Sequence, residues 1–154
     1  ASGASGMPLL MKCLEILRDS EEYRSLLVMS RSAKLTLEQE TDYTLEQLYA
    51  LADEVHDNYN IGAGPASGSY RTMGMIVIPC SMKTLAGIVS GYSDNLVLRA
   101  ADITLNRETC RLSYYPDTKK MSLPENGLSR YGNLSNNRCL CWQEYIMIIW
   151  KRNS

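Results

Sequence analysis

Several features that would direct a functional interpretation are scarce or absent in this sequence. It holds one histidine, His56, and no Cys-x-x-Cys pair, so a structural zinc site is not expected and we predict no metal. The five cysteines are odd in number and unevenly spaced, which argues against a secreted disulfide framework. No apolar run approaches the roughly 18 to 20 residues that a membrane span needs, and no basic-then-apolar leader opens the chain. We therefore expect a cytoplasmic protein with no membrane partner.

An excess of charge of one sign is also lacking. The net charge is -1, so no general nucleic-acid-binding surface is indicated and no nucleic-acid partner is expected. The 154 residues suffice for one domain with a real core. The apolar share of 45% and the charged share of 21% are ordinary for a globular protein, which excludes long disorder and fibrous repeats.

The composition changes near residue 105. Residues 1–105 carry 8 Lys and Arg against 13 Asp and Glu, whereas residues 106–154 carry 8 against 4. We predict a folded domain over residues 1–105 and a divergent tail over residues 106–154. Two interpretations of the tail stay open, a poorly packed extension and the product of a reading-frame change.

Helical and strand patterns alternate along residues 1–105. Apolar spacing predicts a helix from Met7 to Leu17, and Leu26–Met29 is typical of a buried strand. The clearest strand is Met75–Pro79. Other expected elements are a helix capped by Ser32 and running toward Glu40, a helix opened by a capping box of Thr44 and Gln47, a long loop over residues 58–69, and helices over residues 81–89 and 94–101. Strands separated by helices predict an open α/β fold with a parallel sheet covered on both faces.

Ligands of such a sheet collect beyond the carboxyl ends of its strands, where helices begin. Segments that fit this position are Ser2–Gly6 before the first helix, Ser30–Ala33 after the first strand, and Pro79–Thr84 after the clearest strand. Small residues let the backbone approach an anion, and free N–H groups at a helix start attract phosphate. The chain begins inside the first of these segments, and the strand expected before it is missing.

Each candidate also has a purely structural interpretation. Ser30 suits a helix cap as well as a ligand contact, and most lysines such as Lys83 are simply solvated. Cys80 is more typical of a small buried filler than of a nucleophile. Glu40 is either a solvent-facing acid or a proton donor, and His56 is read as a surface residue rather than a base.

Taken together, these segments resemble the flavin prenyltransferases, the UbiX-type family long described as aromatic acid decarboxylases. The likeness runs through about residues 1–105, and the block from Gly74 to Asp102 is specific enough to carry it alone. The segments that match, in chain order, are Gly3-Ala4-Ser5-Gly6, Val28-Met29-Ser30, Glu38-Gln39-Glu40-Thr41-Asp42, Ala66-Ser67-Gly68-Ser69-Tyr70, residues 74–87 and Arg99-Ala100-Ala101-Asp102.

The resemblance implies a Rossmann-like or flavodoxin-like domain that binds FMN and assembles into a homo-oligomer, a dodecamer in the family. Family members transfer a dimethylallyl group from dimethylallyl phosphate to N5 and C6 of the flavin without a metal. The prenylated FMN then serves UbiD-type decarboxylases that act on aromatic or unsaturated acids.

The resemblance also assigns roles to residues of this chain. Ser5 and Glu40 match positions at which the family places residues that assist the chemistry. The residues expected to bind FMN are Gly3, Ala4, Ser5, Ser30, Ser81, Met82, Lys83 and Thr84.

After residue 105 the sequence departs from the family pattern. Asn106 stands where the family has a lysine, and Asp117-Thr118 replaces an Arg-Glu pair that contacts FMN and the leaving phosphate. One alternative is therefore an FMN-binding remnant with impaired catalysis. Another is a relative of the flavin-dependent cysteine decarboxylases, which is disfavoured because that group uses a histidine after an early strand and only His56 is available here.

Overall fold

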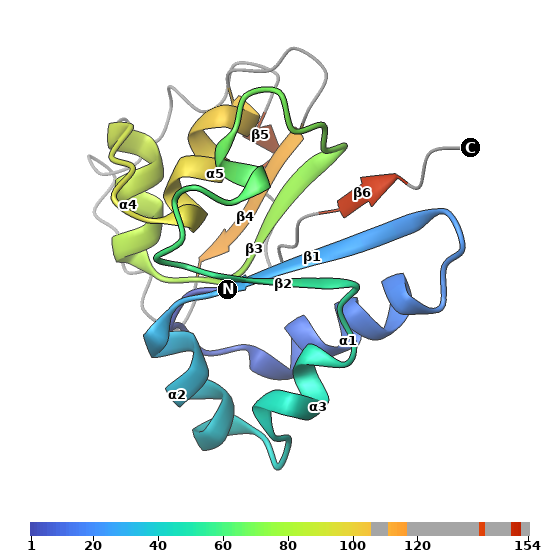
Figure 1. Ribbon diagram of the computed structural model, residues 1–154. Coiled ribbons are helices and arrows are strands. Elements are labelled where there is room, and N and C mark those ends of the chain that lie inside the picture. Colours follow the sequence, from blue (N-terminus) through green and yellow to red (C-terminus); the bar gives the residue numbers. More distant parts are fainter. Residues whose placement is uncertain (106–110, 117–138, 141–148, 152–154) are drawn as a thin grey trace.

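The computed structural model describes residues 1–105 with their side chains and, as backbone strands, residues 111–116, 139–140 and 149–151 (Figure 1). The departures predicted at Asn106 and Asp117-Thr118 lie outside the described residues. Among the residues described, no helix is both long and apolar enough to cross a membrane.

The helix α1, Met7–Arg18, confirms the first predicted helix. It follows Gly6, whose φ of 118° is in a region that favours glycine, and carries Pro8 in its first turn. Its buried face consists of Met7, Leu10, Met11, Leu14 and Leu17.

The next two helices begin with side-chain caps. In α2, Arg31–Glu40, the hydroxyl of Ser30 accepts a hydrogen bond from the Ala33 amide at 3.1 Å. The prediction of Ser32 as the cap was wrong, because Ser30 is the residue with extended backbone whose hydroxyl can reach the first turn. In α3, Leu45–Tyr49, the predicted capping box of Thr44 and Gln47 is confirmed.

The later helices also start close to their predicted positions. Ser81 caps α4, Met82–Ser90, by accepting a hydrogen bond from the Thr84 amide. The helix α5, Leu96–Leu105, begins two residues later than expected. Asn95 accounts for this start, because its side-chain oxygen accepts a hydrogen bond from the Leu98 amide at 3.1 Å.

The strands form one six-stranded sheet in the order β2-β1-β6-β3-β4-β5. The two predicted strands, β1 (Tyr23–Met29) and β3 (Gly74–Cys80), lie near its centre. The remaining strands are β2 (Glu54–Asp57), β4 (Arg111–Pro116), β5 (Cys139–Leu140) and β6 (Ile149–Lys151). The sequence analysis missed β2, since its four residues alternate between half-buried and exposed and carry no apolar run.

Strand directions confirm the predicted α/β class. The pairs β1–β2, β3–β4 and β4–β5 are parallel, whereas β6 runs antiparallel between β1 and β3. Figure 1 shows α1, α2 and α3 gathered on one side of the sheet and α4 and α5 on the other. Strands β4 to β6 come from beyond residue 105 and share the sheet, while the proposed boundary at residue 105 stays a prediction.

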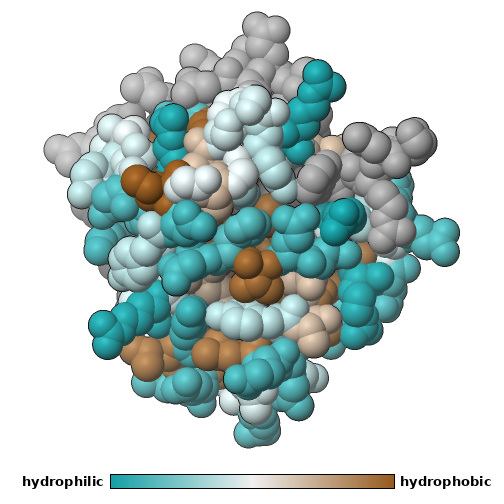
Figure 2. All heavy atoms as spheres, in the orientation of Figure 1, coloured by the Kyte–Doolittle hydropathy of each residue, from teal (hydrophilic) through white to brown (hydrophobic). Residues whose placement is uncertain are grey.

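The core lies between the sheet and both helical layers. Leu26–Met29 of β1 are all buried, as are Met75 and Val77–Cys80 of β3. On the face shown in Figure 2, hydrophobic side chains appear as separate patches among hydrophilic ones. Helices cover both faces of the sheet, and this burial stabilises the central strands. A ligand site can therefore form at the carboxyl ends of the strands, where the loops lie.

Candidate functional site

The first residues of the chain join two corners of the sheet. The Ser2 amide donates a hydrogen bond to the Pro79 carbonyl at 3.0 Å, at the end of β3. On the other side, the Ser30 amide donates to the Ala1 carbonyl at 3.0 Å, just after β1. The segment before α1 thus lies between the carboxyl ends of β1 and β3, where the sequence predicted a ligand site.

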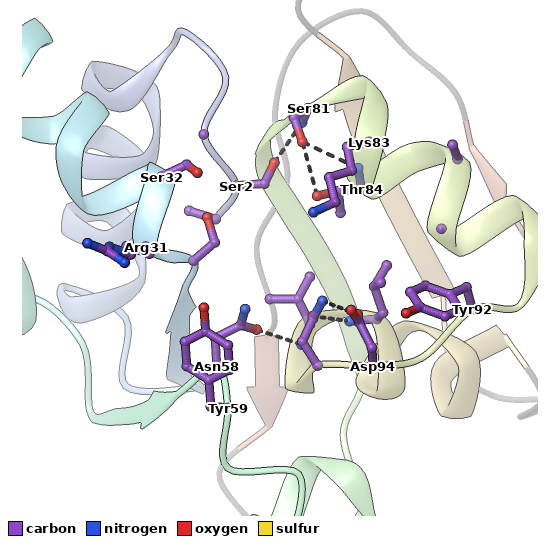
Figure 3. A pocket seen from close by; sticks show the side chains of 18 of the residues that line it. Ser2, Arg31, Ser32, Asn58, Tyr59, Ser81, Lys83, Thr84, Tyr92 and Asp94 are labelled. Atoms are coloured by element: carbon purple, nitrogen blue, oxygen red, sulfur yellow. Dashed lines mark hydrogen bonds between the residues drawn. The ribbon is translucent and has the colours of Figure 1, made fainter.

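A cavity of about 820 Å³ opens at this junction (Figure 3). Its size lies within the roughly 300 to 1,000 Å³ usual for small-molecule and cofactor pockets. Of the predicted binding residues, it is lined by Gly3, Ser30, Ser81, Lys83 and Thr84. Ala4, Ser5, Met82 and Glu40 are not part of the cavity wall, so their predicted roles in binding and catalysis stay predictions.

Two helix starts face this cavity. Arg31 and Ser32 open α2, and Met82 and Lys83 open α4, with backbone N–H groups that a helix cannot satisfy internally. Those amides make no hydrogen bond to another residue that the structure describes. Backbone donors at two helix starts, in one cavity, suit an anion such as phosphate.

Positive side chains add to the attraction. Arg31 and Lys83 both line the cavity, and neither forms an ion pair within the described part of the chain. The acid in the wall is Asp94, on the side of α5 (Figure 3). Lys83 therefore lies with the amide donors of α4, which favours binding of a phosphate-bearing ligand at that side, whereas the Arg31 side chain points away from Ser2 and Ser81 (Figure 3).

The start of α1 differs from the other two. One carboxylate oxygen of Glu40 accepts hydrogen bonds from the amides of Gly6 and Met7, each at 2.9 Å. An anion supplied by the chain itself therefore already sits at this helix start. The amides of Gly6 and Met7 are therefore already bonded to Glu40, while the predicted roles of Gly3, Ala4 and Ser5 in binding FMN stay predictions.

Gly3 is required by a close approach between the first segment and α2. A Cβ atom at this position would lie 2.3 Å from Cβ of Ser32 and 3.0 Å from its carbonyl carbon. Any side chain would push the segment away from the start of α2, where the free amides lie. The glycine-rich segment thus serves the site by its closeness to α2.

Asn58 is a site residue that the sequence analysis missed. It is buried, its side-chain oxygen accepts a hydrogen bond from the Val97 amide at 3.1 Å, and its carbonyl accepts one from Leu96 at 2.8 Å. It therefore fixes the loop after β2 to the start of α5. An asparagine after a strand was the available signal, but the partner is 39 residues away. Other wall residues that were not singled out are Tyr59, Tyr92 and Asp94.

Cys80 and His56, the two residues considered as a nucleophile and a base, are not part of the cavity wall. Cys80 is fully buried, and burial raises the pKa of its thiol to about 12, which confirms the interpretation as a filler. His56 lies in β2 with Nε2 at 3.4 Å from a Glu54 oxygen, and it is not in the cavity wall. Its side chain is 25% exposed, so it is half-buried rather than fully on the surface.

The described residues also show no cluster of three or more His, Cys, Asp or Glu that could hold a metal ion. The site is thus characterised by amide donors, hydroxyls and two cations.

The family model of the flavoproteins matches residues 1–121. The flavin prenyltransferase UbiX of Escherichia coli K12 is 49% identical over 104 residues, which are 68% of this chain and 55% of that protein. The chain therefore spans about half the length of the curated relatives it matches.

Solved structures are similar over more of the chain. A dodecameric FMN-dependent UbiX-like decarboxylase from Escherichia coli O157:H7 has a TM-score of 0.79 and 47% identity, covering 86% of this chain and 70% of that one. AnUbiX, crystallised in complex with FMN and dimethylallyl pyrophosphate, also has a TM-score of 0.79, with 40% identity, covering 91% of this chain and 72% of that one.

Proposed function

This chain belongs to the flavoprotein family and resembles its UbiX-type members at 40 to 49% identity, and from that premise we propose that it is a flavin prenyltransferase. The proposed reaction transfers a dimethylallyl group from dimethylallyl phosphate to reduced FMN. The carbon–nitrogen bond at N5 forms as the allylic carbon–oxygen bond breaks, with phosphate leaving and the N5 proton released. The carbon–carbon bond at C6 forms at the expense of the alkene π bond, which takes up one proton while C6 loses one.

The observation that carries the proposal is the shared cavity at the ends of β1 and β3. It brings Gly3, Ser30 and the Ser81–Thr84 turn together, although these segments lie far apart in the sequence. Free amides at two helix starts, with Lys83, supply the donors that the phosphate of FMN requires. A flavin phosphate bound there would leave the rest of the cavity for the ring system.

Residues of this chain would act on the substrates by position and charge. Reduced flavin is an electron-rich nucleophile, and a leaving phosphate departs more readily when its charge is met by donors. Ser5 would assist the transfer step, the role that the resemblance to the family gives it. Glu40 would contribute by holding the amides of Gly6 and Met7, and so the loop that carries Ser5, in place.

The test is an anaerobic incubation of the full chain with reduced FMN and dimethylallyl phosphate. Mass spectrometry should show FMN enlarged by one dimethylallyl unit, with release of inorganic phosphate. FMN that binds but stays unmodified would support the alternative of a catalytically impaired remnant. Absence of FMN binding would refute both.

A cysteine decarboxylase is the weaker alternative. Its histidine would have to be His56, the single histidine of the sequence, and His56 is outside the cavity wall. We further propose a homo-oligomer, a cytoplasmic location and delivery of the product to a UbiD-type decarboxylase. Elution of the purified chain as a monomer in size-exclusion chromatography would contradict the first of these.

A further inference from the structure

Ser2 ties the first segment of the chain to the junction of β3 and α4, next to Ala1, which accepts a hydrogen bond from Ser30 after β1. Ser2 is 3% exposed, and its hydroxyl bridges two backbone groups at the junction of β3 and α4. Ser2 Oγ donates a hydrogen bond to the Pro79 carbonyl at 2.9 Å and accepts one from the Ser81 amide at 2.6 Å. Figure 3 shows Ser2 pointing toward Ser81 across the space between the two corners.

These bonds determine what the hydroxyl can do. A serine hydroxyl has a single hydrogen to donate, and the Pro79 carbonyl takes it. Ser2 therefore has no donor left for a bound phosphate. Its side chain acts on the protein backbone and not on the ligand.

The Ser81 amide is the first link to the binding groups. Ser81 caps α4 through its own hydroxyl, which accepts from the Thr84 amide and lies 3.1 Å from the Thr84 hydroxyl. With the Ser81 amide held by Ser2, the turn before α4 is anchored, and the start of α4 keeps its place at the cavity wall. Without the Ser2 hydroxyl, the amide loses its partner and the turn loses its anchor.

The second link runs through the backbone of the same residue. The carbonyl of Ser2 accepts a hydrogen bond from the Ala4 amide at 2.8 Å, and the next residue, Gly3, lies against Ser32 at the start of α2. Ser2 thus bonds directly to the junction of β3 and α4, while its neighbours Ala1 and Gly3 lie against Ser30 and Ser32 at the start of α2.

We propose that Ser2 is a positioning residue, whose hydroxyl anchors the turn before α4 and so keeps the phosphate-binding amides of α4 in place beside those of α2. This inference rests on the proposed function, since FMN is the ligand whose phosphate those amides would bind. Loss of the Ser2 hydroxyl is expected to weaken binding of the FMN phosphate and to leave binding of the flavin ring unchanged.

The experiment compares Ser2→Ala and Ser2→Thr with the unmodified full chain. Affinities for FMN and for riboflavin, which lacks the phosphate, are measured by fluorescence titration. Ser2→Ala should weaken FMN binding about tenfold and change riboflavin binding less than about twofold, as loss of an anchored donor set implies. Ser2→Thr, which keeps a hydroxyl, should restore most of the FMN affinity.

Ser25→Ala is the matched control. Ser25 is also a buried serine with hydrogen bonds to and from one partner, Asp53, but it lies at the beginning of β1, away from the cavity. Its loss should lower stability without changing the ratio of FMN to riboflavin affinity. If Ser25→Ala changes that ratio as much as Ser2→Ala does, the inference is overturned.

A second readout needs no ligand. Amide hydrogen exchange in the flavin-free chain should be faster at Ser81 in Ser2→Ala, by about tenfold or more, and unchanged in Ser25→Ala. Should the unmodified chain fail to bind FMN, the proposed function fails, and exchange at Ser81 alone decides whether Ser2 anchors the turn.

If Ser2→Ala does not fold, Ser2→Val and Ser2→Thr are compared instead, because valine and threonine have nearly the same shape. Unchanged Ser81 exchange, or equal losses of FMN and riboflavin binding, would overturn the inference.

Discussion

Glu40 accepts a hydrogen bond from the backbone amide of Met7 at 2.9 Å, so the last residue of α2 supplies the anion at the start of α1. The same carboxylate oxygen accepts from Gly6. Negative charge at a helix start is favourable because the unpaired amides there carry partial positive charge. Glu40 thus links the second helix to the loop that contains Ser5.

We expect Glu40→Ala to lower the free energy of unfolding by about 1 to 3 kcal/mol, because it leaves two amides without their acceptor. Glu40→Gln should cost less, since its amide oxygen can still accept. Urea denaturation followed by circular dichroism measures both. Glu38→Ala is the control, because Glu38 is exposed on the same helix. Equal effects of the two alanine variants would contradict the role given to Glu40.

Gly3→Val should abolish retention of FMN while the helical circular dichroism signal is largely kept. The new side chain would meet Ser32 well inside contact distance and displace the first segment from α2. Gly68→Ala is a suitable control, since a Cβ there meets nothing within 4 Å. FMN that remains bound to Gly3→Val through gel filtration would count against the placement of the ligand.

Lys83→Gln should weaken FMN binding by about three- to tenfold and leave riboflavin binding nearly unchanged, because the lost charge faces the phosphate. The difference from the unmodified chain should shrink as salt is added, since exposed charges are screened. Lys12→Gln, which removes a surface lysine paired with Glu15 on α1, should have no such effect. Isothermal titration at low and high ionic strength provides the measurement. A loss that is equal for both flavins would show that Lys83 does not meet the phosphate.

Cys80 makes stability sensitive to alkaline pH. Burial raises the pKa of its thiol from 9.0 to about 12, so the unfolded chain releases this proton at lower pH than the folded one. The stabilising contribution is complete below about pH 9 and is lost as the pH rises toward 12. Urea unfolding between pH 8 and about 11 should show a fall that is shallower in Cys80→Ala. Identical slopes in the two proteins would contradict the assignment.

Local patterns predicted most of the elements around the site. The apolar spacing of α1 and the apolar runs of β1 and β3 are local sequence patterns that determine the type of element. The structure confirms all three elements. The capping box at Thr44 was recognisable for the same reason. These elements suffice to place the ends of β1 and β3, where the cavity lies.

Contacts between distant residues could not be predicted in this way. Glu40 reaches Gly6 across 34 positions, and Ser2 reaches Ser81 across 79. Nothing in the composition of either segment indicates its partner, since a carboxylate or hydroxyl can bond to any exposed amide. The antiparallel pairing of β6 with β1 is also a long-range choice.

The most direct test of the account is a titration of the isotope-labelled chain with FMN, followed through the backbone amide resonances. The account predicts that the largest shifts fall on Gly3, Ser30–Ser32 and Ser81–Thr84, and that riboflavin leaves the amides at the starts of α2 and α4 much less affected. Shifts that gather elsewhere, or that are the same for FMN and riboflavin, would contradict a phosphate held between these two helix starts.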